Sequence, residues 1–170
     1  LVLEKLSPQG TIKVDSCVLD EKGNFSFENY TPSIGFYRIK FSDQNFGMLV
    51  MDSVDKISVT GSVKDLGNTY KVSGSPETKL FLEYNDLAKA NRFRVDSLQE
   101  AFKMAMTMVK MDSIRMDSLS NVFEGVFNKI IDAYSEQVAQ KIMTNNNMFA
   151  SIMAIQPLDP DKYADVFRAL

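Results

Sequence analysis

The sequence of 170 residues contains no histidine and no tryptophan, and its single cysteine is Cys17. Without histidine, the chain has no Ser-His-Asp or Cys-His catalytic group, no imidazole zinc ligand and no imidazole pH switch. One cysteine forms neither an intrachain disulfide nor a Cys-x-x-Cys redox pair. Acidic neighbours do not activate this thiol, so we interpret Cys17 as a small strand residue. The sequence therefore indicates no catalytic residue and no cofactor in this chain.

Charge and hydropathy exclude further classes of partner. The chain has 19 Lys and Arg against 22 Asp and Glu, a net charge of −3, and no basic stripe. Nucleic acids and anionic membrane surfaces therefore have no electrostatic attraction to it. No apolar run reaches the roughly 18 residues that cross a membrane. Because the chain opens with Leu1 in a strand-like pattern and ends at Leu170 in a helical one, we expect a piece of a longer protein.

Residues 1–74 are predicted to form an antiparallel β domain. Apolar and polar residues alternate there with the period of two of a strand that has one buried face. Turn residues such as Gly23 separate the runs at short intervals, which favours a β-sandwich or partial barrel of about seven strands. The expected strands are "LVLEKL" (1–6), "TIKVDSCVLD" (11–20), "GNFSFE" (23–28), "FYRIKF" (36–41), "FGMLVM" (46–51), "KISVTG" (56–61) and "YKVSG" (70–74).

Residues 75–170 are predicted to be helical, so that the whole fold is α+β. The change comes at "GSPETK", where Ser75 is an expected N-cap and Pro76 suits the first helical position. Residues 96–143 form one long helix or two, and the cap-like Asp-Ser pairs at 112 and 117 favour a break there. Further helix starts are expected at the capping box Asp96 to Gln99, in "MFASIMAI" (148–155) and at Asp159-Pro160.

Three methionines are the candidate metal ligands of the sequence. Met104, Met108 and Met111 have the spacing of one helix face, and thioethers suit Cu(I). The same spacing is that of ordinary packing, since methionine fills irregular gaps. A methionine-rich docking surface is a further interpretation. We favour the non-metal interpretations and assign no metal site.

Aromatic residues of the β half suggest another binding site. Phe25, Phe27, Phe36, Tyr37 and Phe41 would line a cleft for a small molecule, or they form the core. A carboxylate hydrolase is the weakest hypothesis, because the acidic residues are scattered. Many of them precede serine, which is typical of turns and caps.

Four motifs follow one another within residues 1–90: Asp-Ser-Cys (15–17), a Gly-centred hairpin into Phe-x-Phe (23–27), Tyr-Arg (37–38) and Val-Ser-Gly-Ser (72–75). This order resembles the N-terminal domain of unknown function that precedes thioredoxin-like domains in Gram-negative envelope proteins. Residues 145–167, "NNNMFASIMAIQPLDPDKYADVF", resemble the linker helices before the redox domain of such proteins.

The resemblance implies an exported protein, periplasmic or lipid-anchored at the outer membrane, with a following thioredoxin fold of the alkyl hydroperoxide reductase and thiol-specific antioxidant type. Activity there resides in Trp-Cys-x-x-Cys, which this chain lacks. We therefore expect the non-catalytic accessory half of a thiol–disulfide oxidoreductase, which positions the redox domain or recognises an unknown client. The alternative is a stand-alone envelope domain that binds a small molecule or Cu(I). The long helices pack within the chain or pair with a second copy as a homodimer.

Overall fold

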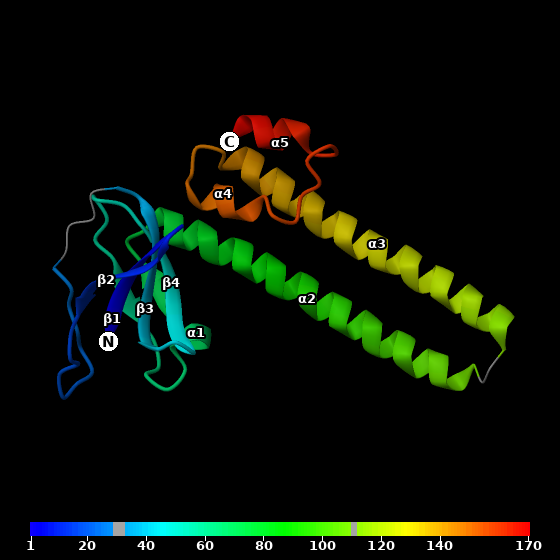
Figure 1. The fold of residues 1–170 in the computed structure, drawn as a ribbon, viewed down its shortest axis with the longest axis horizontal. Coiled ribbons are helices and arrows are strands. Elements are labelled where there is room, and N and C mark those ends of the chain that lie inside the picture. Colours follow the sequence, from blue (N-terminus) through cyan, green and yellow to red (C-terminus); the bar gives the residue numbers. More distant parts are fainter. Residues whose placement is uncertain (29–32, 110–111) are drawn as a thin grey trace. The chain divides into compact units, whose positions relative to one another are not determined.

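The computed structural model describes residues 1–28, 33–109 and 112–170. They form two compact units. The β unit comprises Leu1–Leu82 and Met148–Ala150, and the helical unit comprises Glu83–Asn147 and Ser151–Leu170. Figure 1 shows antiparallel strands followed by long helices, so the predicted mixed fold of sheet and then helices is confirmed. The division between residues 74 and 75 stays a prediction.

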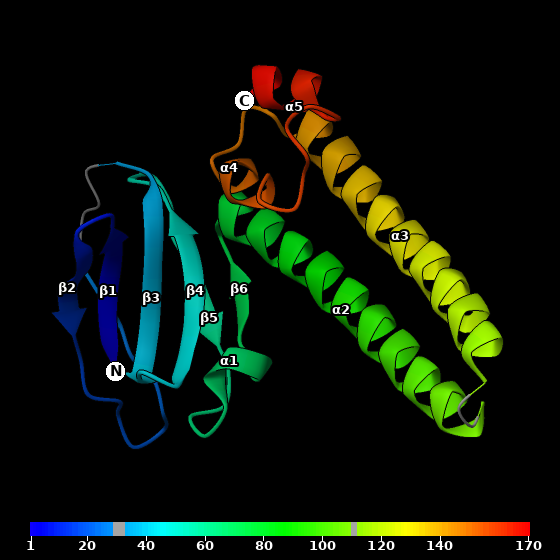
Figure 2. The same ribbon diagram turned by 45° about the vertical axis from the view of Figure 1, so that its right-hand side comes forward.

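Two open antiparallel sheets make up the strands of the β unit (Figure 2). The main sheet has the order β2-β1-β3-β4 and consists of β1 (Val2–Ser7), β2 (Gly10–Ser16), β3 (Gly35–Ser42) and β4 (Asn45–Met51). The small sheet pairs β5 (Ser58–Thr60) with β6 (Lys71–Ser73), and the short helix α1 (Leu66–Thr69) lies between them in sequence. Six of the seven expected strands are thus present in the described part of the chain, where the sheets do not close into a barrel.

The expected strand "GNFSFE" is the one that does not form. Phe25 and Phe27 are half-buried while Ser26 and Glu28 are exposed, so the alternation correctly marks the buried side. Residues 24–28 nevertheless belong to no strand in the described part of the chain. The prediction was wrong because alternation reports which side chains are buried and does not show that a neighbouring strand supplies ladder hydrogen bonds.

The core of the β unit lies on one face of the main sheet. Its members are at most 5% exposed and come from three strands and from α1: Leu3, Tyr37, Ile39, Leu49 and Leu66. Burying each large apolar side chain stabilises the fold by roughly 1.5–3 kcal/mol. This face therefore carries the main core of the unit. On the opposite face, Val50 is also fully buried, and Arg38 and Lys40 carry charge.

Side chains close the outer edge of β4. The Tyr70 hydroxyl accepts the Met48 N–H (3.3 Å) and donates to the Met48 carbonyl oxygen (3.1 Å). Further along the strand, the Val50 N–H donates to Oγ1 of Thr78 (2.9 Å). The hydroxyls of Ser75 and Thr78 both donate to the Val50 carbonyl oxygen (2.7 Å each). Buried backbone groups need partners, and here the side chains of Tyr70, Ser75 and Thr78 supply them.

The helices are α2 (Pro76–Met108), α3 (Ser113–Thr144), α4 (Ala150–Ala154) and α5 (Ala164–Ala169). The predicted start of α2 is confirmed, because Ser75 Oγ accepts the Thr78 N–H at 3.1 Å and Pro76 is the first helical residue. Gly74 precedes them with φ of +86°, which suits glycine. In the described residues, no helix is long and apolar enough to cross a membrane.

Only one of the Asp-Ser caps expected within the long helical region forms as a helix cap. Asp112 is the N-cap of α3, and its carboxylate accepts the Arg115 N–H. The break near residue 112 is therefore confirmed. Asp117 lies inside α3 and Asp96 inside α2, so the predicted capping box was wrong. Inside a helix, the backbone N–H groups already bond to the preceding turn and leave none for a cap.

The last two short helices follow the predicted order with one shift. α4 falls inside the expected segment 148–155. Asp159 accepts the N–H groups of Asp161 and Lys162, but it caps a turn, and the α-helix begins later than predicted, at Ala164.

In the helical unit, α2 and α3 lie side by side and antiparallel in both views (Figures 1 and 2). The rings of Phe102 and Phe123 lie 4.4 Å apart between centroids, and Lys141 bonds to Glu83 at 2.6 Å. The two helices thus pack within one chain. Pairing with a second copy stays a prediction, and Phe93, at 74% exposure, is one of several apolar side chains left open on this unit.

Candidate functional site

The two faces of the main sheet differ in chemistry. On β3, Tyr37 and Ile39 are buried in the core, whereas Arg38 and Lys40 lie on the opposite face, as the alternation predicts. One face therefore carries a network of charges, and the other borders a cavity.

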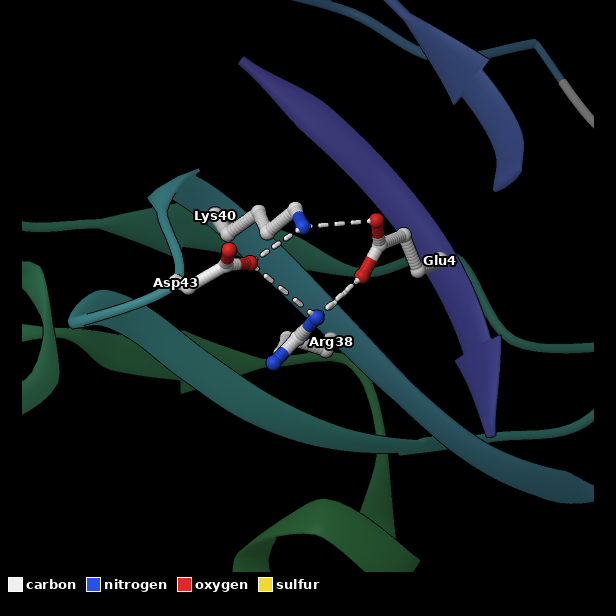
Figure 3. A network of polar contacts seen from close by, with 4 residues as sticks. All are labelled: Glu4, Arg38, Lys40 and Asp43. Atoms are coloured by element: carbon white, nitrogen blue, oxygen red, sulfur yellow. Dashed lines mark hydrogen bonds and ion pairs between the residues drawn. The ribbon is translucent and has the colours of Figure 1, made fainter. Parts of the chain in front are cut away.

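Four charged side chains form the Glu4 network, drawn in Figure 3. Nη2 of Arg38 lies 2.6 Å from one Glu4 oxygen, and Nζ of Lys40 lies 2.8 Å from the other. Nζ of Lys40 also lies 2.7 Å from Asp43, in the turn after β3. The register of β1 on β3 places Glu4 opposite Arg38. The Arg38 guanidinium lies 5.3 Å from the centre of the Phe46 ring, a cation–π distance.

The network shifts the titration of its own members. Hydrogen bonds from Lys40 and then Arg38 lower the pKa of Glu4, while burial opposes them. Hydrogen bonds to Asp43 and Glu4 raise the pKa of Lys40. The pKa of Asp43 is lowered by its hydrogen bond from Lys40, so the pKa values of Glu4, Lys40 and Asp43 all move away from neutral pH. We interpret the network as a structural tie between β1, β3 and the turn after β3.

A cavity of about 580 Å³ lies against the other face. Strand residues such as Leu3, Ile39 and Leu49 contribute to its lining, as do Phe25 and Phe27 from the extended segment after β2. Residues 57–61, which include β5, add a further part of the wall. Its volume falls in the range of small-molecule sites, roughly 300–1,000 Å³.

The turn at residues 52–55 brings two carboxylates to the cavity lining. Oδ1 of Asp52 accepts the Ser53 N–H (2.7 Å), and Oδ2 of Asp55 accepts the Asp52 N–H (3.0 Å). The lining contains no Lys or Arg, and neither carboxylate forms an ion pair with the residues that the structure describes. The amino group of Leu1, another lining residue, donates to the Cys17 carbonyl oxygen.

Three of the five aromatic residues proposed for a cleft line the cavity: Phe25, Phe27 and Phe41. Tyr37 belongs to the buried core instead. Phe36 also lies elsewhere, with its ring 5.1 Å from that of Phe149.

Sequence reasoning missed the two carboxylates of the lining. The Asp52-Ser53 pair does signal a turn, as expected. No local signal shows that this turn borders a cavity, because the opposite walls come from strands distant in sequence.

The methionine site stays a prediction. Met104 and Met108 are 61% and 79% exposed on α2, and Met111 lies outside the described residues. Among the residues at 1–28, 33–109 and 112–170, no group of three or more His, Cys, Asp or Glu is placed to hold a metal ion. Cys17 is half-buried and forms no disulfide.

Comparison with protein families matches the first part of the chain. Residues 1–81 match the model of a family described as a domain of unknown function, DUF4369. No curated protein and no solved structure matches the chain. The first segment of the β unit is Leu1–Leu82, and the matched range ends one residue before the end of this segment. The family model therefore describes one compact unit of the structure.

Proposed function

We propose that this chain is the non-catalytic accessory part of an exported thioredoxin-like thiol–disulfide oxidoreductase. In this proposal the β unit recognises a partner or client protein in the cell envelope. The observation that carries it is the agreement between the family match at 1–81 and a compact unit with its own core. A self-contained module of this kind suits a recognition role beside a separate catalytic domain.

The helical residues 75–170 lead toward the redox domain in this proposal. Their support is the likeness of residues 145–167 to the linker helices of such proteins. The catalytic Trp-Cys-x-x-Cys belongs to the following domain of the parent protein.

The reading frame on both sides of this chain tests the proposal directly. We expect an export signal upstream and a Trp-Cys-x-x-Cys motif within about 150 residues downstream, the size of one further domain. A stop codon immediately after Leu170 would overturn it.

The recognition role has a separate biochemical test in the parent protein. A variant without the second cysteine of the redox motif traps its client as a mixed disulfide. Removing residues 1–81 should abolish this trapping and leave the reduction of a small generic disulfide unchanged. Equal trapping with and without these residues would refute recognition by the β unit.

A second candidate function is small-molecule binding by a stand-alone envelope domain, and the cavity favours it. Saturable binding of a small ligand by the chain of 170 residues would support this function. Its Cu(I) form predicts that the chain competes for Cu(I) and that Met104→Leu weakens this competition. Unchanged competition by the variant would exclude that form.

A further inference from the structure

We propose that the cavity of the β unit binds an apolar small molecule that is uncharged or cationic, and that it rejects anions. The inference rests on the second proposed function, small-molecule binding by this unit. It adds the chemical class of the ligand, which the lining residues determine. It is independent of the accessory role in a redox protein.

The apolar part of the lining provides the attraction. Phe25, Phe27 and Phe41 present three aromatic rings, and Leu3 and Ile39 belong to the buried core beneath them. The rings of Phe25 and Phe27 lie 5.8 Å apart, so they form one continuous apolar surface. A ligand with a ring or short hydrocarbon body would be removed from water against this surface.

The charges of the lining set the sign of the ligand. Among the described residues of the lining, Asp52 and Asp55 contribute two carboxylates and none is Lys or Arg. The amino group of Leu1 is the one cation there and donates to the Cys17 carbonyl oxygen, so negative charge is in excess. An anionic ligand would lose its hydration and then meet like charges, both of which weaken binding. A ligand with a hydroxyl or amine would instead donate to these carboxylates. Fatty acids and other anionic amphiphiles are therefore the wrong class.

The segment that carries two of the rings also provides a way in. Within the described residues, 24–28 belong to no strand, and Phe25 and Phe27 pack against the core of the sheet without ladder hydrogen bonds to it. Separating such a segment from the sheet breaks fewer hydrogen bonds than lifting a paired strand. Ligand entry therefore does not require disruption of the main sheet.

Two fluorescent probes that differ by one sulfonate test the inference on the intact chain. Phenyl-naphthylamine is uncharged, and anilinonaphthalene sulfonate is its anionic analogue. We expect the uncharged probe to bind saturably and the sulfonate to bind at least about tenfold more weakly. Because this comparison uses the unaltered chain, it does not depend on the folding of any variant.

Substitutions then assign the discrimination to the carboxylates. The double variant Asp52→Asn and Asp55→Asn should raise the affinity for the sulfonate toward that for the uncharged probe, whose own affinity should change by less than about twofold. The amide oxygen of each Asn still accepts the backbone N–H. The matched control, Asp161→Asn and Asp165→Asn, makes the same change in net charge at exposed positions of the helical unit and should leave both affinities unchanged.

Energy transfer locates the bound probe. The chain has no tryptophan, so Phe41→Trp introduces a single indole into the lining. Bound phenyl-naphthylamine should quench this indole strongly.

Each outcome decides one part of the inference. Weaker binding of the sulfonate that the Asn variant removes supports the proposed ligand class. Equal binding of the two probes at the cavity overturns the ligand class and leaves small-molecule binding in place. No saturable binding, or no quenching of the indole at position 41, overturns the cavity site together with the second proposed function. None of these results bears on the redox accessory role, which the parent reading frame tests.

Discussion

Thr78→Val tests how much the side-chain hydrogen bonds at the outer edge of β4 stabilise the β unit. The Thr78 side chain is fully buried, and its hydroxyl both accepts the Val50 N–H and donates to the Val50 carbonyl oxygen. Valine has nearly the same shape but no hydroxyl. In the variant, the carbonyl oxygen keeps its bond from Ser75, whereas the Val50 N–H loses the partner that Thr78 provides.

The expected cost follows from this single unpaired group. A buried donor left without a partner costs about 1–3 kcal/mol. Taking about 2 kcal/mol, the Tm of a unit of this size falls by roughly 8–16 °C. Thermal unfolding followed by circular dichroism measures the shift, and hydrogen exchange of the Val50 amide measures it at the site.

An exposed threonine on a strand provides the matched control. Thr11 lies on β2 and is exposed, so Thr11→Val should change the free energy of unfolding by no more than about 0.5 kcal/mol. If Thr78→Val lowers the free energy of unfolding by no more than this control does, the side-chain hydrogen bonds at the edge of β4 do not stabilise the unit. That result would refute the prediction.

Three further predictions concern a glycine, a cap and an ion network. Gly74 and Gly23 both have positive φ, but a Cβ at Gly74 would overlap the Lys56 carbonyl oxygen, whereas Gly23 has open space. Gly74→Ala should therefore cost more than about 3 kcal/mol in urea unfolding, and Gly23→Ala about 1 kcal/mol from backbone strain alone. Asp112→Ala should lower stability by about 1 kcal/mol through the lost cap, while Asp117→Ala, inside α3, should have little effect on the same assay. The pKa of Glu4 lies below its ordinary value of 4.5, so the stability that the Glu4 network contributes is present at neutral pH and is lost as pH falls through the folded pKa. Urea unfolding at a series of pH values should show a shallower acid loss for Glu4→Gln than for the original chain, and parallel curves would refute this contribution.

Local patterns predicted the elements whose partners are local. The alternation of β3 identified both its faces, and Ser75 and Pro76 identified the start of α2, because these signals depend on neighbouring residues only. The same kind of signal failed at Asp96. Its Asp-Ser pair matches that at Asp112, but a cap needs free backbone N–H groups, and these exist only where the helix begins.

Contacts between segments that are distant in the chain could not be predicted from local sequence patterns. Val50 and Thr78 are 28 residues apart, and nothing near either residue indicates their contact. Asp52 and Asp55 have the ordinary composition of a turn. Only the folded walls make them part of a cavity. The identity of a ligand or client has no local signal for the same reason.

The order of synthesis leaves the outer edge of β4 without its side-chain partners for part of the time that the chain is being made. Strands β1 to β4 leave the ribosome before Ser75 and Thr78, so a nascent chain that ends at β6 has Val50 without either of these partners. An unpaired strand edge is a template for association with other chains. The first turn of α2 therefore completes the hydrogen bonding of the β unit. A recombinant fragment that ends between β6 and this turn should aggregate, whereas a fragment that extends to residue 81 should not. The family match, which continues to residue 81, includes this turn.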